Sequence, residues 1–132
     1  MEIAPALFRR DIADGEWRRY WAGRLNAPGT TVAVAETGTG VLTGSILFDV
    51  QDRPQSLFTH AHRRLFIEHL VVDPDWRRAG IGAGLMQYAE DRAAALGIGE
   101  LRLGVWAANA PAQAFFAGAG YQPLNMVCVK RL

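Results

Sequence analysis

The sequence lacks most of the features that mark secreted, membrane and nucleic-acid-binding proteins. Its single cysteine, Cys128, excludes an internal disulfide and a metal centre built from several cysteines. No apolar run approaches the roughly 18–20 residues of a membrane span, and the first residues carry no basic signal-peptide region. Lys and Arg total 14 against 13 for Asp and Glu, so no basic surplus favours nucleic acid. We therefore expect a cytoplasmic protein with neither nucleic acid nor a membrane as partner.

The 132 residues are enough for one domain with its own core, and we expect a single domain over residues 1–132. Apolar spacing predicts, in order, a helix over 6–26, strands over 30–36, 41–50 and 64–72, a helix over 81–96 capped by Gly97, a strand over 100–105, a helix over 107–118 and short closing strands within 121–132. The unit 64–105 requires a parallel crossover, whereas the earlier strands form antiparallel hairpins. This order predicts an α/β (α+β) fold with a mixed, mostly antiparallel central sheet flanked by helices.

The most informative stretch is a strand that runs into a glycine-rich turn and then a helix, over residues 68–86. Glycines at 80 and 82 let the backbone approach an anion closely, and the first turn of a helix offers unpaired N–H groups. Arg77 and Arg78 add guanidinium groups that suit phosphate oxygens. The pattern predicts a pyrophosphate site. The alternative is that Gly80, Gly82 and Gly84 only permit close packing of the helix on the sheet.

Two common phosphate-binding motifs do not fit this turn. The phosphate-loop pattern needs a lysine there, and the chain's only lysine is Lys130. The dinucleotide pattern GxGxxG fails because its third glycine comes one position early, at Gly84. From the residues alone, the site is a phosphate-binding strand–turn–helix unit.

The stretch from Arg77 to Gly82 (RRAGIG) fits the pattern (Q/R)xxGx(G/A), the acetyl-CoA signature of the GNAT superfamily of acyl-CoA-dependent N-acetyltransferases. The chain resembles this superfamily on both sides of the signature. Residues 68–74 (EHLVVDP) are similar to its central strand. Asn109, Ala112, Phe115-Phe116 and Gly120-Tyr121 are similar to its NxxAxxFYxxxGF segment. The resemblance covers residues 30–132 well and the first 29 poorly.

The resemblance implies an enzyme that moves an acetyl group from acetyl-CoA to a primary amine by direct attack on the thioester. It implies that backbone groups hold the pantetheine arm at Leu70, Val71 and Val72. It implies a pyrophosphate site formed by Arg77, Arg78, Ala79, Gly80, Ile81, Gly82 and Ala83. It places Asn109 beside the pantetheine and Phe116 at the thiol end. The acceptor would be a small-molecule or protein amine, and no metal is implied.

The chain departs from the family's pattern in two places. Phe116 stands where the family usually has a tyrosine that protonates the leaving thiolate, so water or another group would supply that proton. The same departure supports an alternative, a catalytically weak or inactive CoA-binding sensor or regulatory protein. The chain also begins where the family's second helix approaches, so we expect the usual first strand and helix to be absent, through a minimal fold or a misplaced start codon. A homodimer could then cover the exposed sheet edge. A further alternative is a nucleotide-binding domain.

Glu68 is the candidate general base. Strict alternation along its strand predicts that it shares a face with apolar neighbours, Phe66, Leu70 and Val72. A carboxylate on such a face is unusual. It would accept the ammonium proton, directly or through water. The alternative is a structural ion pair with Arg64 or Arg102.

The remaining polar residues have simpler readings. We expect His69, on the opposite strand face, to be a core histidine, and His60 and His62 to be solvated in a loop over 51–63. Two histidines alone do not make a metal site. Cys128 is expected to be a small buried hydrophobe. Asn109 is also expected to cap the helix that follows it, with a proline in its first turn.

Overall fold

The computed structural model describes residues 23 and 27–132. The helix predicted over 6–26 lies almost wholly outside the described residues and stays a prediction. The described chain falls into two compact units, one that ends at Gly104 and one that begins at Val105. Each is treated by itself below, and the single domain expected over 1–132 also stays a prediction.

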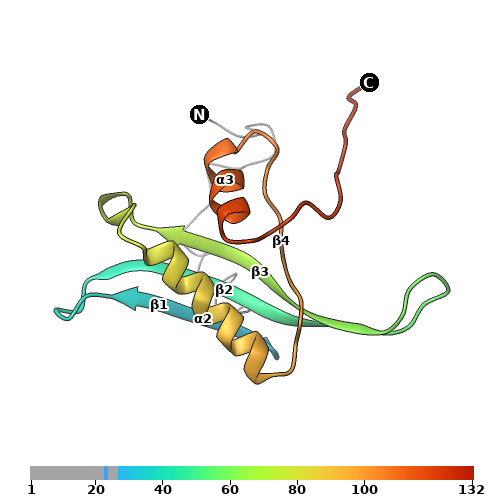
Figure 1. Ribbon diagram of the computed structural model, residues 1–132, viewed down its shortest axis with the longest axis horizontal. Helices are drawn as coiled ribbons and strands as arrows, with labels where there is room; N and C mark the ends of the chain where they lie inside the picture. Colours follow the sequence, from blue (N-terminus) through green and yellow to red (C-terminus); the bar gives the residue numbers. More distant parts are fainter. Residues whose placement is uncertain (1–22, 24–26) are drawn as a thin grey trace. The chain divides into compact units, whose positions relative to one another are not determined.

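The first unit is built on a four-stranded sheet with the order β1-β2-β3-β4 (Figure 1). Its strands are β1 (Thr30–Glu36), β2 (Leu42–Arg53), β3 (His62–Val72) and β4 (Leu101–Leu103). The first three pair antiparallel, and β4 pairs parallel with β3. The mixed, mostly antiparallel sheet is therefore confirmed.

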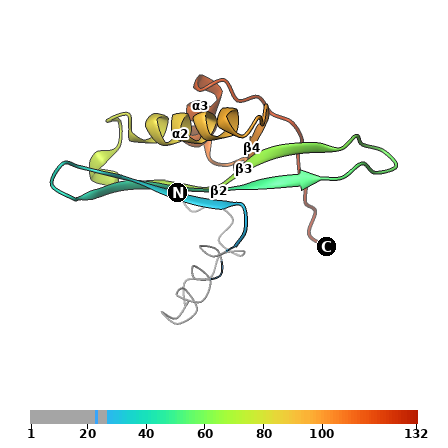
Figure 2. The same cartoon turned by 90° about the horizontal axis from the view of Figure 1, so that it is seen from below.

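The parallel pairing of β3 with β4 requires a crossover, and helix α2 (Ile81–Ala95) provides it. Figure 2 shows α2 lying along one face of the sheet. The helix ends as predicted at Gly97, which has a left-handed φ of 72°. The N–H of Gly97 donates to the Ala94 carbonyl at 3.1 Å, and the N–H of Ile98 donates to the Ala93 carbonyl at 2.8 Å. These two bonds satisfy carbonyls that the helix end leaves open.

The core of this unit lies between α2 and the sheet. The sheet contributes buried apolar side chains, Ile46, Phe48, Leu65 and Ile67. The helix contributes Leu85, Met86, Ala89 and Ala93. Burying each large apolar side chain contributes about 1.5–3 kcal/mol, so these contacts fix the helix on the sheet. The rings of Phe48 and Tyr88 also meet, with centroids 6.2 Å apart.

Strand β3 contains a bulge that sequence alternation did not predict. Leu47 of β2 lies opposite His69, and the next residue, Phe48, lies opposite Ile67. Glu68 is therefore an extra residue on β3. A bulge of this kind bends the strand and changes which side chains share a face.

The bulge corrects the predicted faces. Phe66 lies opposite Asp49, and Leu70 lies opposite Ile46, so Phe66 and Leu70 are on opposite faces of the sheet. Glu68 therefore does not share one face with Phe66, Leu70 and Val72. Likewise His69 shares its face with Phe66 rather than with Ile67. We call the face that carries Asp49, Phe66 and His69 the Asp49 face, and the other the α2 face.

Other boundaries differ from the predictions. The ladder of β2 and β3 continues to the pair Arg53 and His62, so the loop between them is shorter than the predicted 51–63. The backbone hydrogen bonds of the two strands continue into polar sequence, which apolar spacing cannot detect. The closing strands predicted within 121–132 are not formed in the described chain, and Cys128 is exposed rather than buried.

The second unit contains helix α3 (Ala110–Gly118). Its predicted cap is confirmed, because Asn109 Oδ1 accepts the N–H of Ala112 at 3.2 Å. Three aromatic rings pack together at the C-terminal end of α3. Phe116 meets Phe115 edge-on, with centroids 5.0 Å apart, and Tyr121 at 5.9 Å.

Gly44 on β2 allows the closest approach between α2 and the sheet. A Cβ at this position would lie 2.9 Å from the Val71 carbonyl oxygen and 3.0 Å from Ile81 Cγ2. Because the strand carbonyl cannot move freely, Gly44→Ala should lower the free energy of unfolding by about 1–3 kcal/mol. Urea unfolding would measure this.

Gly99→Ala is the matched control, since a Cβ there would meet no atom within 4 Å. We expect its unfolding free energy to stay within about 0.5 kcal/mol of the parent. Equal effects of the two substitutions would contradict the steric role of Gly44.

Candidate functional site

The turn that follows β3 is held by Asp73. Its N–H donates to the Thr43 carbonyl at 2.8 Å, which fixes the turn to β2. Its side chain accepts the N–H of Asp75 at 2.9 Å and so caps the short helix η1 (Pro74–Trp76). The chain therefore leaves β3 in a defined direction before it enters the glycine-arginine stretch.

Two left-handed residues then bring the chain to α2. Arg78 has a φ of 66°, uncommon for a residue with a side chain, and Gly80 has a φ of 81°. No side chain caps the helix, and its first bond runs from the Gly84 N–H to the Gly80 carbonyl at 3.0 Å. The N–H groups of the first turn thus remain available, at the positive end of the helix dipole. This geometry suits an anion.

The two arginines of the turn strengthen that electrostatic character. Arg77 and Arg78 are both exposed, and neither forms an ion pair with any residue that the structure describes. Two guanidinium groups that no described carboxylate pairs with, beside open backbone N–H groups, make a positive surface. Such a surface can hold a pyrophosphate through several charge-assisted hydrogen bonds.

The packing alternative for the glycines does not agree with the structure at two of the three positions. A Cβ on Gly80 or on Gly84 would meet no atom within 4 Å. Close packing therefore does not require glycine at these positions. Gly80 is needed for its left-handed φ instead. The open space favours approach by a ligand.

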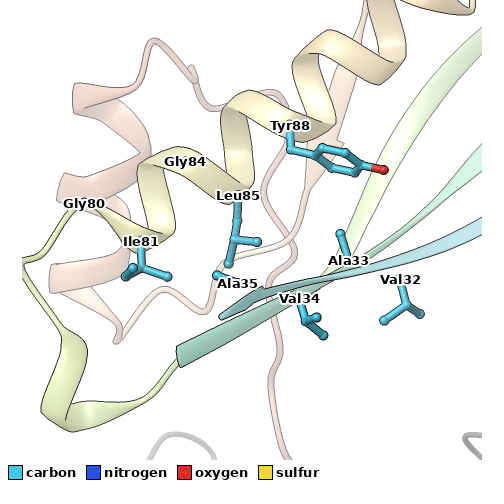
Figure 3. A pocket seen from close by; sticks show the side chains of 9 residues that line it. All are labelled: Val32, Ala33, Val34, Ala35, Gly80, Ile81, Gly84, Leu85 and Tyr88. Carbon is cyan, nitrogen blue, oxygen red and sulfur yellow. The ribbon is translucent and has the colours of Figure 1, made fainter. Parts of the chain in front are cut away.

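An open groove of about 510 Å³ lies between β1 and α2 (Figure 3). Its lining is Val32, Ala33, Val34, Ala35, Gly80, Ile81, Gly84, Leu85 and Tyr88. No charged side chain lines it, so the groove offers apolar contact. The charged groups begin at its Gly80 end, where the groove reaches the turn.

The end of β3 offers a second set of backbone groups. The parallel ladder with β4 stops at the pair Ile67 and Leu103, whereas β3 continues to Val72. Within the unit that ends at Gly104, β4 therefore gives no ladder partner to the predicted pantetheine residues, Leu70, Val71 and Val72. Their polar groups on that side can bond an extended ligand as a further strand would.

Glu68 stands at the bulge and is half-buried. Glu68 has an interaction partner in the structure, and its role as the base stays a prediction. Arg102 pairs with Glu100 at 3.2 Å. Arg64 donates from Nε to Gln51 Oε1 at 2.8 Å. The predicted base is thus adjacent along β3 to the backbone groups of Leu70.

His62 is part of β3 and not a solvated loop residue. Its Nδ1 lies 3.0 Å from the His60 carbonyl oxygen, and its Nε2 lies 2.8 Å from Arg64 Nη1. Because a carbonyl can only accept, Nδ1 carries the proton and Nε2 accepts from the guanidinium. His69 is half-buried rather than a fully buried core residue.

Sequence reasoning missed Asp49. Its Oδ1 is buried and has no hydrogen-bond partner in the part of the chain that the structure describes. The signal was present in the sequence, since an aspartate interrupts the apolar strand from Ile46 to Val50. Asn109 and Phe116 lie in the unit that begins at Val105, and their contacts with a ligand stay predictions.

Two further observations concern the described residues alone. No three His, Cys, Asp or Glu side chains among them gather as metal ligands would. None of their helices is both long and apolar enough to cross a membrane.

Comparison with known proteins supports the resemblance. A model of the acetyltransferase (GNAT) family matches residues 2–121. No curated protein matches the sequence.

Three solved structures share its fold. The tetramutant of the BH1408 protein from Bacillus halodurans is 18% identical, with a TM-score of 0.83 over 86% of this chain and 73% of that one. An aminoglycoside antibiotic 6′-N-acetyltransferase from Acinetobacter haemolyticus is 16% identical, with a TM-score of 0.76 over 92% and 83%. Glucosamine-6-phosphate N-acetyltransferase from Arabidopsis thaliana is 17% identical, with a TM-score of 0.68 over 94% and 82%.

The double variant Arg77→Gln/Arg78→Gln should bind acetyl-CoA more weakly, on the order of tenfold or more, because charge-assisted bonds to phosphate are lost. Calorimetry at two salt concentrations would measure the affinity and its salt dependence, and both should fall. Arg92→Gln is the control, since it removes the same charge from the last turn of α2. Equal affinities for parent and double variant would overturn the pyrophosphate site.

Proposed function

Because the chain belongs to the acetyltransferase (GNAT) family, whose members are acyltransferases, we propose that it transfers an acetyl group from acetyl-CoA to a primary amine. The observation that carries this proposal is the start of α2. There a helix without a side-chain cap, with open backbone N–H groups, follows left-handed Gly80. Two guanidinium groups directly before it form no ion pair with any described residue. Open backbone N–H groups and guanidinium groups are the hydrogen-bond donors that a pyrophosphate needs.

The donor site has two parts on this chain. The backbone of residues 78–83 and the side chains of Arg77 and Arg78 would hold the pyrophosphate. The backbone of Leu70, Val71 and Val72 would hold the pantetheine arm, where β3 extends beyond β4. Acetyl-CoA, when bound, supplies the activated acetyl group. The protein orients it and presents it to the amine.

The acceptor must lose a proton for the reaction to proceed. Its neutral nitrogen attacks the thioester carbonyl carbon, a C–N bond forms and the C–S bond breaks. Glu68 would take the proton from the ammonium, directly or through water. The departing thiolate takes a proton from water or from another group, because Phe116 has none to give.

A second function deserves a test because of Phe116. This ring packs between Phe115 and Tyr121, with centroids 5.0 and 5.9 Å away, and donates no proton. The position supports a protein that binds CoA and signals its presence with little or no turnover. Turnover with a panel of amines separates the two functions.

The donor is tested first by thermal unfolding with acetyl-CoA, ATP or NAD. A ligand at about 100 times its dissociation constant stabilises the fold by roughly 2.7 kcal/mol. We expect acetyl-CoA alone to raise the midpoint, on the order of 5 °C. An equal rise with ATP or NAD would favour the nucleotide-binding reading, and no rise with acetyl-CoA would overturn the proposal.

Glu68→Gln tests the base. We expect kcat/KM to fall by about 10²–10⁴-fold, the usual contribution of general base catalysis, while acetyl-CoA affinity stays unchanged. The control is Glu36→Gln, at an exposed position on β1. Undiminished turnover in Glu68→Gln would exclude the base role. Acetyl-CoA binding by the parent without turnover on any amine would favour the sensor.

A further inference from the structure

Strand β1 is an open edge of the sheet. Within the described chain, the strand order places β2 on one side of β1 and no strand on the other. Natural edge strands are commonly protected by charged residues, by proline or by a bulge. Residues 30–35 (TTVAVA) contain neither a charged residue nor a proline. The bulge of this hairpin gives no protection either, because its extra residue, Thr43, lies in β2.

The hydrogen bonds to β2 show which backbone groups of β1 point outward. The N–H of Val50 donates to the Gly29 carbonyl at 3.1 Å, one step before the first pair of the ladder, so this pair is hydrogen-bonded. Hydrogen-bonded and non-hydrogen-bonded pairs alternate along an antiparallel ladder. The N–H and carbonyl groups of Val32 and Val34 therefore point away from β2. They form a row of donors and acceptors along the open edge.

Apolar surface lies on both sides of this row. Val32 and Val34 are 39% and 54% exposed, and Tyr88 of α2 is 41% exposed. The open groove of about 510 Å³ runs between β1 and α2. Figure 3 shows the side chains of Ala33 and Ala35 on the α2 side of β1, and those of both valines on the other side. The edge thus offers backbone hydrogen bonds between two apolar surfaces, which suits another β-strand.

Strand β1 is complementary to a second copy of itself. Ala33 is the middle of the seven residues Thr30–Glu36, so a two-fold axis at Ala33 pairs the whole strand with its copy. Val32 then lies opposite Val34 of the second copy, and the outward backbone groups of both meet. A shift by one residue would place outward groups against inward ones. The same axis pairs Glu36 with Thr30 of the second copy, which keeps the two carboxylates apart.

We propose that two copies of this chain associate through their β1 edges, as an antiparallel pair centred on Ala33. The two sheets then form one continuous sheet, with both α2 helices on the same face. The two grooves join across the axis, because both lie on the α2 side of β1, and apolar surface that each copy exposes is buried. An unrelated strand would need no two-fold match. The agreement of strand length, backbone direction and charge favours a second copy.

The oligomeric state of the full chain tests this interface. We expect sedimentation to show a dimer that dissociates on dilution. Val34→Lys should weaken the dimer by about tenfold or more, because lysine at an edge opposes strand pairing. Leu57→Lys is the matched control. It replaces an apolar side chain that is 89% exposed at the tip of the β2–β3 hairpin, and it should leave the dimer intact.

Cysteine substitution tests the register. At the axis the two copies of Ala33 form a non-hydrogen-bonded pair, whose Cα atoms lie about 4.5 Å apart, and a disulfide can span that distance. Ala33→Cys should therefore give a disulfide-linked dimer in air. The background is Cys128→Ser, because Cys128 is exposed. Ala35→Cys is the control, since its two copies would lie four residues apart along the strands, about 13 Å.

A monomer at every concentration overturns the proposal. A dimer that Leu57→Lys weakens as much as Val34→Lys does so too, as does a dimer in which Ala33→Cys cross-links no faster than Ala35→Cys. Circular dichroism verifies that each variant is folded. These measurements need neither acetyl-CoA nor an amine, so their outcome is independent of the proposed acetyl transfer.

Discussion

The close approach of α2 to β2 at Gly44 is the constraint on which the rest of the site depends. With only a hydrogen on Gly44, Ile81 and Leu85 rest against the strand, and the Val71 carbonyl passes within 2.9 Å of where a side chain would begin. The first turn of α2 is therefore set directly beside the end of β3. This one contact brings the open N–H groups of the helix close to the strand backbone that would hold the pantetheine.

The two faces of the sheet differ in composition. The α2 face supplies the apolar side chains that hold the helix. The Asp49 face carries carboxylate, amide and guanidinium groups together with Leu47, which is only 1% exposed. The bulge at Glu68 stands between the pairing with β4 and the extension beyond it.

Sequence patterns predicted the parts whose chemistry is local. The turn at residues 77–83, the α2 helix and the caps at Gly97 and Asn109 depend on residue types at fixed spacing, and the structure shows each of the predicted elements. The resemblance implied a bulged strand, but alternation could not place the bulge at Glu68, because apolar residues occur on both faces of β3 and give no register. The common face of Arg64 and Asp49 could not be predicted either, because it arises only through cross-strand pairing, which no spacing along the chain reveals. The prediction of strands within 121–132 was wrong for another reason. Apolar spacing indicates that a segment can form a strand, but it does not show that a neighbouring strand is there to pair with it.

The length of the β2–β3 hairpin has a mechanical consequence. Strand β1 begins opposite Asp49 and β4 begins opposite Leu65, yet β2 and β3 remain paired as far as Arg53 and His62. Beyond the sheet they form a ribbon of two strands (Figure 1), which twists more readily than a four-stranded sheet. The Arg64 guanidinium is clamped by Gln51 and His62 where this ribbon leaves the sheet. The exposed Leu57 and Phe58 lie at the tip of this hairpin, so a contact made there would act on a part of the chain that only two strands hold.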